Sequence, residues 1–101
     1  MFLFLPITTQ AYDRFNCWSY ITERVDKIIP VVELINNATT TPHLGDIAVM
    51  RYEKQGLNHF AYVELVTDDF ILVSETNYKA GIFGFRFLPL DYPNLIGYYN
   101  N

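Results

Sequence analysis

Four residues of this 101-residue chain could together perform thiol chemistry. Cys17, its only cysteine, lies at the expected start of an amphipathic helix, and His59 begins an expected strand. Glu75 and Asn77 place a carboxylate and a carboxamide on the strand after that. A nucleophilic thiol, a base and a polar group that orients the base are the parts of a cysteine-nucleophile site. The set therefore predicts a thiol-dependent enzyme.

The position of Cys17 favours a reactive thiol. N–H groups and the dipole at a helix N-terminus stabilise a thiolate, which lowers the pKa of the sulfur. Other roles are common for each residue type. A lone cysteine is usually a small buried hydrophobic residue, and His59 or Glu75 could equally lie in solvent at the end of a strand. The spacing alone leaves these alternatives open.

Apolar residues recur at helical spacing ahead of Pro30: Cys17, Ile21, Val25 and Ile28. This stripe predicts an amphipathic helix that begins after Asp13, is capped by either Asp13 or Asn16, and ends at Pro30. A second, shorter helix is expected over residues 31–35. The stripe also places Cys17 on the side of the helix that faces the rest of the fold.

From Gly45 onward, runs of β-branched and aromatic residues alternate with turn-forming residues. These runs predict strands at residues 47–52, 59–66, 70–75, 82–88 and about 95–99. Short connections favour an antiparallel arrangement. We therefore expect one α+β domain over residues 1–101, with the cysteine helix packed on one face of an antiparallel sheet of about five strands.

Strand register decides whether the candidate residues meet. Side chains alternate between the faces of a sheet, so His59 and Glu75 share a face only if paired residue numbers sum to an even value. That requires a hairpin loop of odd length around Asp68, or a compensating β-bulge. A two-residue loop of Asp68-Asp69 would by itself put Glu75 and Asn77 on the opposite face. The sequence does not choose between these cases.

Composition excludes several other classes of function. The formal net charge is −4, and the seven basic residues form no stripe, so a nucleic-acid partner is not expected. The Cys, His and acidic residues show no metal-binding spacing and the glycines form no phosphate-binding loop, so neither a metal nor another cofactor is expected. The apolar stretch Met1-Phe2-Leu3-Phe4-Leu5 is too short to span a membrane and lacks the features of a secretory signal. The absence of a signal fits a protein that is released from the cytoplasm by lysis, built into a particle, or simply cytoplasmic.

Four stretches resemble the cysteine/histidine-dependent amidohydrolase/peptidase (CHAP) family, a papain-like group of bacterial and phage peptidoglycan hydrolases. They are Asn16-Cys17-Trp18-Ser19-Tyr20, Gly45-Asp46-Ile47-Ala48-Val49, His59-Phe60-Ala61-Tyr62-Val63 and Ile71-Leu72-Val73-Ser74-Glu75-Thr76-Asn77. Ile96-Gly97-Tyr98 resembles the last strand of the family. The chain departs from the family in having Asn16 where glutamine is common, and in a short segment between Cys17 and Gly45. Its Phe15-Asn16-Cys17-Trp18 is also similar to the NlpC-type cell-wall peptidases.

The resemblance implies a papain-like fold and a role for each candidate residue. Cys17 would be the nucleophile, His59 the general base and Glu75 the residue that orients the imidazole, with Asn77 as the alternative. The backbone N–H of Cys17, with Asn16 or Tyr12, would hold the oxyanion, and Trp18 and Tyr12 would line a substrate groove. The implied reaction cleaves an amide of peptidoglycan through an acyl-thioester, as an amidase or an endopeptidase.

Two other functions fit the same residues. One is a non-catalytic structural or binding component of a phage particle on the same fold, favoured by the missing wall-targeting module and the tyrosine-rich end Gly97-Tyr98-Tyr99-Asn100-Asn101. The other is a cytoplasmic thiol hydrolase or transferase that acts on a different amide or ester. Because the acidic chain has no electrostatic attraction to anionic wall polymers, a partner protein in the virion or at the wall is expected to supply targeting.

Overall fold

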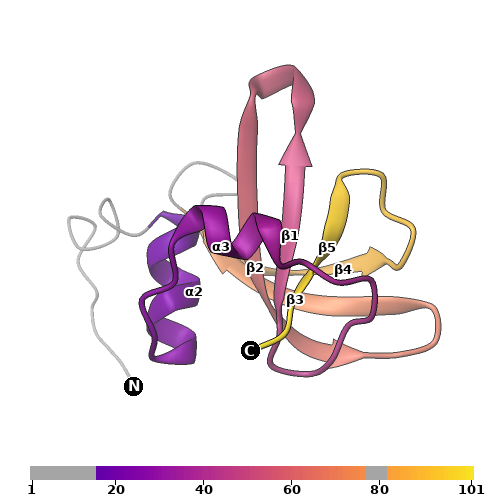
Figure 1. Ribbon diagram of the computed structural model, residues 1–101. Coiled ribbons are helices and arrows are strands. Elements are labelled where there is room, and N and C mark those ends of the chain that lie inside the picture. Colours follow the sequence, from indigo (N-terminus) through magenta and orange to yellow (C-terminus); the bar gives the residue numbers. More distant parts are fainter. Residues whose placement is uncertain (1–15, 77–81) are drawn as a thin grey trace.

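The computed structural model describes residues 16–76 and 82–101, and Figure 1 shows their arrangement. Tyr12, Asn77 and the apolar stretch at the start of the chain lie outside these described residues. Helices α2 and α3 precede the strands and the short 3-10 helix η1. The bounds are α2 Cys17–Val25, α3 Val31–Asn36, β1 Ile47–Tyr52, η1 Glu53–Gln55, β2 Leu57–Val66, β3 Phe70–Thr76, β4 Phe83–Pro89 and β5 Leu95–Tyr99.

Helix α2 begins where the capping pattern indicates and ends earlier than expected. Asn16 is the N-cap, because its Oδ1 accepts the backbone N–H of Ser19 at 2.8 Å; Asp13, the alternative cap, lies outside the described residues. The helix ends at Val25 because Asp26 adopts a left-handed conformation with φ 60°. Its predicted continuation to Pro30 was wrong. Ile28, the last residue of the apolar stripe, is consequently 79% exposed.

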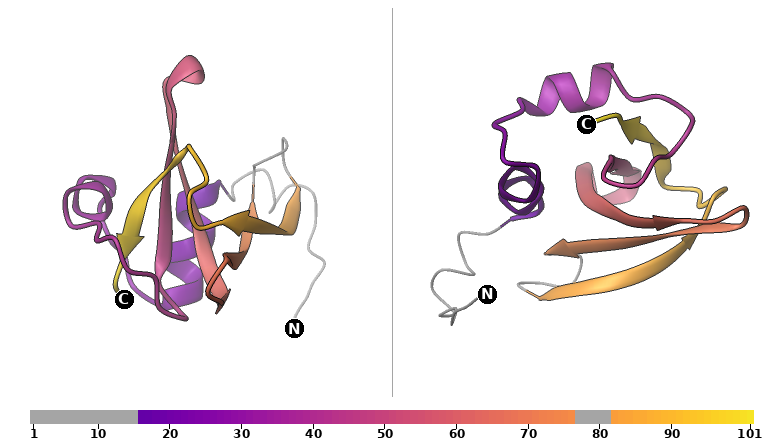
Figure 2. Two further views of the ribbon diagram at one scale, coloured as in Figure 1. Left: turned by 90° about the vertical axis from the view of Figure 1, so that its right-hand side faces the viewer. Right: turned by 90° about the horizontal axis from the view of Figure 1, so that it is seen from below.

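The five strands form one sheet in the order β4-β3-β2-β1-β5, and every neighbouring pair is antiparallel. Strands β1 to β4 follow one another directly, and β5 returns to pair with the free side of β1. Helix α2 packs against β2 and β3, whereas α3 lies against β1. Both helices lie on the same side of the curled sheet (Figure 2). The expected α+β arrangement, a cysteine-bearing helix on an antiparallel sheet of five strands, is confirmed.

Each face of the sheet has its own apolar cluster. The helix-facing cluster joins buried residues of the helices and of β1 and β2: Ile21, Ile29, Leu34, Ile47, Val49 and Phe60. The cluster on the opposite face, which we call the inner face, contains Ala48, Met50, Ala61, Val63, Ile71, Val73, Leu88 and Tyr98. Because residues alternate between faces, β1 and β2 each contribute to both clusters, whereas β3 contributes Ile71 and Val73 to the inner face only.

A β-bulge sets the register on which the site depends. Asp68 and Asp69 form a two-residue loop, since the N–H of Thr67 bonds to the carbonyl of Phe70 at 2.9 Å. Near this loop, paired residue numbers of β2 and β3 sum to an odd value, as in Val66 with Ile71. The register shifts between Val63 and Leu65, and beyond that point Tyr62 pairs with Ser74, which gives an even sum. The bulge therefore returns the acidic end of β3 to the face that carries His59.

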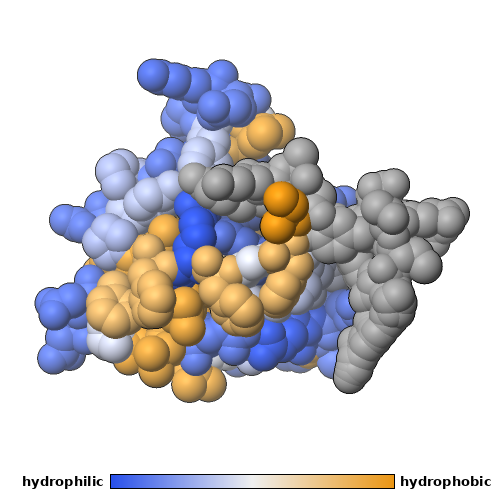
Figure 3. Space-filling view, turned by 180° about the vertical axis from the view of Figure 1, so that it is seen from behind, coloured by the Kyte–Doolittle hydropathy of each residue, from blue (hydrophilic) through white to orange (hydrophobic). Residues whose placement is uncertain are grey.

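Strand β4 is an edge strand with an unusual pattern of exposure. Its three phenylalanines are among the exposed apolar residues of the chain: Phe83 45%, Phe85 59% and Phe87 64%. Gly84, Arg86 and Leu88 alternate with the phenylalanines and are less exposed, and among these Leu88 is buried. The space-filling view from behind shows an extended apolar area on this side of the molecule (Figure 3).

Candidate active site

Cys17 is the first residue of α2 and is half-buried at the edge of the helix-facing cluster. Burial alone would raise the pKa of its thiol. The hydrogen bond to His59, the charge of His59 and the backbone N–H groups of Phe60 and Trp18 outweigh burial and lower that pKa below its ordinary value. The sulfur therefore lies where a thiolate is stabilised from several directions.

His59 connects the sulfur to a carboxylate. The ring lies near the start of β2 and is buried, with 6% of the residue exposed. Its Nε2 donates to Glu75 Oε1 at 2.7 Å. Because Glu75 occupies Nε2, the ring nitrogen left for the hydrogen bond with Cys17 is Nδ1. Burial lowers the pKa of His59, but the hydrogen bonds and charges of Cys17 and Glu75 raise it above its ordinary value.

Glu75 lies on β3 and is almost fully buried, at 2% exposure. Its Oε1 accepts from His59, and its Oε2 accepts from Arg86 Nε at 2.5 Å. Burial would raise the pKa of the carboxyl, but the hydrogen bonds and charges of His59 and Arg86 lower it below its ordinary value. Glu75 is therefore an ionised carboxylate at neutral pH, and it fixes both the orientation and the tautomer of the imidazole.

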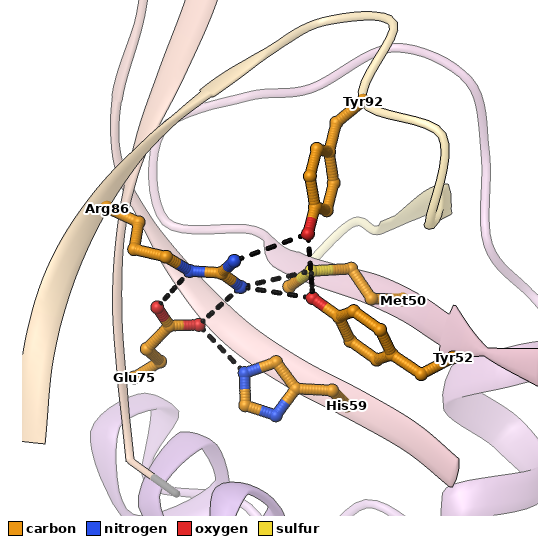
Figure 4. A network of polar contacts seen from close by, with 6 residues as sticks. All are labelled: Met50, Tyr52, His59, Glu75, Arg86 and Tyr92. Atoms are coloured by element: carbon orange, nitrogen blue, oxygen red, sulfur yellow. Dashed lines mark hydrogen bonds and ion pairs between the residues drawn. The ribbon is translucent and has the colours of Figure 1, made fainter. Parts of the chain in front are cut away.

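Figure 4 shows the polar network that continues behind Glu75 on the inner face of the sheet. Arg86, from β4, donates to Glu75 and also to the hydroxyl of Tyr52 at 3.3 Å. The hydroxyls of Tyr52 and Tyr92 are 3.1 Å apart. Burial, together with the Tyr92 hydrogen bond, raises the pKa of Tyr52 to about 12, so this phenol is neutral at neutral pH.

The other predicted site residues have structural contacts or lie outside the described residues. The carboxamide oxygen of Asn16 caps α2, and the indole Nε1 of Trp18 donates to the carbonyl of Ile29 at 2.7 Å. Tyr12, the other oxyanion candidate, and Asn77, the alternative orienting residue, belong to the undescribed part of the chain. Among the candidates that the structure describes, Cys17, His59 and Glu75 come together.

Sequence reasoning missed Arg86 and the backbone N–H of Phe60. Arg86 alternates with three phenylalanines, and the usual rule places apolar residues inside and a charged residue outside. The structure has the opposite arrangement, because Arg86 finds its partner Glu75 on the inner face. Phe60 lowers the pKa of Cys17 through its backbone N–H, so its side-chain type gives no signal in the sequence. Its role can be recognised only once His59, its neighbour in the chain, is placed beside the sulfur.

The three side chains form a charge-alternating chemical unit. The lowered pKa of Cys17 and the raised pKa of His59 both favour a thiolate beside an imidazolium, with the Glu75 carboxylate behind the ring. In that form the sulfur can attack an electrophilic carbon while the ring supplies a proton. Within residues 16–76 and 82–101, no group of three or more His, Cys, Asp or Glu side chains is placed to hold a metal ion. In the same residues, no helix has the length and apolar character needed to cross a membrane.

Comparisons of the chain with protein-family models, with curated proteins and with solved structures found no match.

Proposed function

We propose that this protein is a cysteine-dependent hydrolase of amide bonds with a papain-like arrangement of its site. Cys17 is the nucleophile, His59 the general acid and base, and Glu75 the orienting residue. One observation carries the proposal: a single buried imidazole is bonded to a helix-terminal thiol on one side and to an ionised carboxylate on the other. This is the geometry that nucleophile, base and orienting residue require.

The reaction proceeds in two halves. The Cys17 thiolate attacks the carbonyl carbon of the amide, and N–H groups at the start of α2, that of Cys17 among them, stabilise the oxyanion. The carbon–nitrogen bond then breaks as the His59 imidazolium gives its proton to the leaving amine, which leaves an acyl-thioester. Neutral His59 next takes a proton from water, the resulting hydroxide equivalent attacks the thioester, and the free acid departs. The thiolate–imidazolium pair is restored.

We propose peptidoglycan as the substrate, at an amide of its peptide stem, its cross-bridge or its sugar–peptide junction. The support is the resemblance to the CHAP family of the stretches that begin at Asn16, Gly45, His59 and Ile71. Three of these stretches carry the proposed site side chains, with Cys17 at the start of α2, His59 on β2 and Glu75 on β3. A partner that brings the acidic chain to the wall belongs to the same proposal.

Purified peptidoglycan provides the test. The wild-type chain is expected to release soluble fragments, and mass spectrometry of their new termini would identify the bond that is cut. Cys17→Ala should abolish release, because no other residue can form the thioester. Glu64→Gln is the matched control, since it alters a carboxylate on the opposite face of β2 and should leave hydrolysis intact. Release by Cys17→Ala at the wild-type rate would refute the proposed mechanism.

The rival function, a non-catalytic component of a phage particle on the same fold, makes a different prediction. A structural descendant has no need of a thiolate, so its cysteine should titrate in the ordinary range for a free thiol, near pH 8.5. Absence of hydrolysis together with an ordinary thiol would favour that function. A perturbed thiol without peptidoglycan hydrolysis would instead indicate a thiol hydrolase of another amide or ester.

A further inference from the structure

Arg86 fixes the oxygen that orients the imidazole. Its Nε donates to Glu75 Oε2 at 2.5 Å, and its Nη2 donates to Glu75 Oε1 at 3.1 Å. Oε1 is also the atom that accepts from His59 at 2.7 Å. A planar guanidinium that donates to both carboxylate oxygens fixes the plane of the carboxylate. Arg86, together with the backbone of β3, therefore fixes the position of Glu75 Oε1, the atom that accepts from the imidazole.

The guanidinium is itself held from two further directions (Figure 4). Nη2 donates to the Tyr52 hydroxyl on β1 at 3.3 Å, and Nη1 donates to the Tyr92 hydroxyl, ahead of β5, at 3.4 Å. The ring of Tyr92 lies 5.7 Å from the guanidinium carbon. Only 17% of the Arg86 side chain is exposed. Three parts of the fold thus converge to place one cation against Glu75.

The charges along this line alternate in sign. In the thiolate–imidazolium form that the pKa shifts favour, Cys17 faces His59, His59 faces the Glu75 carboxylate, and Glu75 faces Arg86. A buried carboxylate without a cation takes up a proton more readily, and a protonated Glu75 no longer supports the positive charge on His59. Arg86 is the one member of the line whose charge does not titrate in the working range of pH.

We propose that Arg86 is a positioning residue of this site, which keeps Glu75 ionised and aimed at His59 and so extends the thiolate form of Cys17 to lower pH. This inference rests on the proposed function, since it assigns Arg86 to the same Cys17 site. Arg86 acts through Glu75, the carboxylate that it shares with His59.

Titratable and charged side chains that face the series Cys17, His59, Glu75 and Arg86 come from several elements of the fold. Among the described residues, they are Cys17 on α2, Tyr52 on β1, His59 on β2, Arg86 on β4 and Tyr92 before β5. The Tyr52 phenol is neutral at neutral pH, so the cations that oppose loss of the Glu75 charge are His59 and Arg86, and of these only Arg86 keeps its charge across the working range of pH.

The test measures the rate at which iodoacetamide alkylates Cys17 as a function of pH. The acid limb of this profile marks the pH at which the thiolate is lost. Arg86→Met keeps much of the side-chain volume but removes the cation, and the limb is expected to move to higher pH by about one unit or more. Arg24→Met is the matched control: it breaks a similar arginine–glutamate pair on the opposite face and should leave the limb in place.

A double-mutant cycle shows whether Arg86 acts through Glu75. In a Glu75→Gln background the carboxylate is gone, so adding Arg86→Met should shift the acid limb much less than it does in the wild type. An equal shift in both backgrounds would overturn the inference. So would an acid limb of Arg86→Met that coincides with that of Arg24→Met.

Should Arg86→Met fail to fold, Arg86→Lys gives the same test against Arg24→Lys. A single ammonium group cannot reproduce the two-pronged contact with Glu75, so the acid limb of Arg86→Lys should lie at higher pH than that of its control. Coincidence of the two limbs would contradict the inference. Alkylation requires no substrate, so the two possible failures can be told apart. If the wild-type thiol has a lowered pKa that Arg86 does not influence, only the inference about Arg86 fails. If the wild-type thiol is ordinary, the proposed function fails.

Discussion

Two arginine–glutamate pairs lie on opposite faces of the same sheet and have nearly the same construction. On the inner face, Arg86 binds Glu75 and the hydroxyls of Tyr52 and Tyr92. On the helix-facing side, Arg24 binds Glu64 at 2.6 Å, donates to the Tyr20 hydroxyl at 3.0 Å and lies 4.1 Å from the ring centroid of Tyr62. Each cation therefore has one carboxylate and two tyrosines as partners.

The pairs differ in burial and in the group at the far side of the glutamate. The side chains of Arg24 and Glu64 are 38% and 23% exposed, whereas those of Arg86 and Glu75 are 17% and 3% exposed. Glu64 accepts from the Ser74 hydroxyl at 2.7 Å, and serine does not titrate. Glu75 accepts from His59, which faces a thiol.

The same kind of ion pair thus has two different surroundings. The pair on the helix side joins α2 to β2 and, through Ser74, to β3, and its charges are partly screened by water. The pair on the inner face is sheltered from water, so its charges act strongly on their neighbours. The neighbour that titrates, His59, in turn contributes to lowering the pKa of Cys17.

The largest expected effect compares Glu75→Gln with Glu64→Gln. Glu75→Gln keeps the shape of the side chain but loses the charge that stabilises the imidazolium, and kcat/KM for hydrolysis should fall by about 100-fold or more. Glu64→Gln should change kcat/KM by about two-fold or less, because its carboxylate has no contact with His59. Steady-state hydrolysis of soluble peptidoglycan fragments measures both. Similar losses in the two variants would show that the faces are not functionally distinct.

The next effect concerns stability. Arg86→Met leaves the buried Glu75 charge facing fewer cations and should lower the free energy of unfolding by about 3 kcal/mol at neutral pH. Arg24→Met breaks a partly exposed pair and should lower it by about 1 kcal/mol or less. Urea denaturation followed by circular dichroism provides both values. Equal losses of unfolding free energy in the two variants would show that burial does not set the contribution of these ion pairs to stability.

The stability cost of Arg86→Met should also depend on pH, with a defined sign. In the wild type the pKa of folded Glu75 is lowered by His59 and Arg86 against the opposing effect of burial, so its contribution is complete above the unfolded-state pKa and is lost as pH falls through the folded-state pKa. The gap between wild type and Arg86→Met should therefore shrink as pH falls below about 4.3. Repeating the urea titrations at several pH values checks this, and a gap that widens in acid would contradict it.

The smallest expected effect uses two matched hydroxyl deletions. Tyr20→Phe removes a hydroxyl bonded to Ser74 and Arg24, and Tyr52→Phe removes one bonded to Arg86 and Tyr92. Each should cost about 1 kcal/mol of unfolding free energy. We expect a small shift in the acid limb of Cys17 alkylation for Tyr52→Phe and none for Tyr20→Phe. A shift of the same size in both would mean that the two networks influence the thiol equally.

The sequence predicted much of the fold and the three residues that meet. β-branched runs place β1 and β5 with their observed bounds, because turn-forming residues delimit them clearly. The end of α2 was not predictable from apolar spacing. Asp26 adopts the left-handed conformation that closes the helix, and a non-glycine residue gives only a weak signal for that conformation.

Two features of the site could not have been predicted from pattern alone. The bulge between Val63 and Leu65 places Glu75 on the face of His59, and bulges leave little trace in a single sequence. Arg86 faces inward from a strand whose phenylalanines face outward, against the usual alternation. The reason is a specific partner, Glu75, and pattern rules describe average burial and not specific pairs.

The most direct test of the central claim is the titration of Cys17 in the wild-type protein, followed by the ultraviolet absorbance of the thiolate. Because the chain has one cysteine, the signal belongs to that residue alone. We expect the thiolate to be formed already at pH values well below the ordinary thiol pKa of about 8.5, and to be lost from this range in His59→Gln. A single transition near pH 8.5 in both proteins would mean that His59 does not stabilise the thiolate.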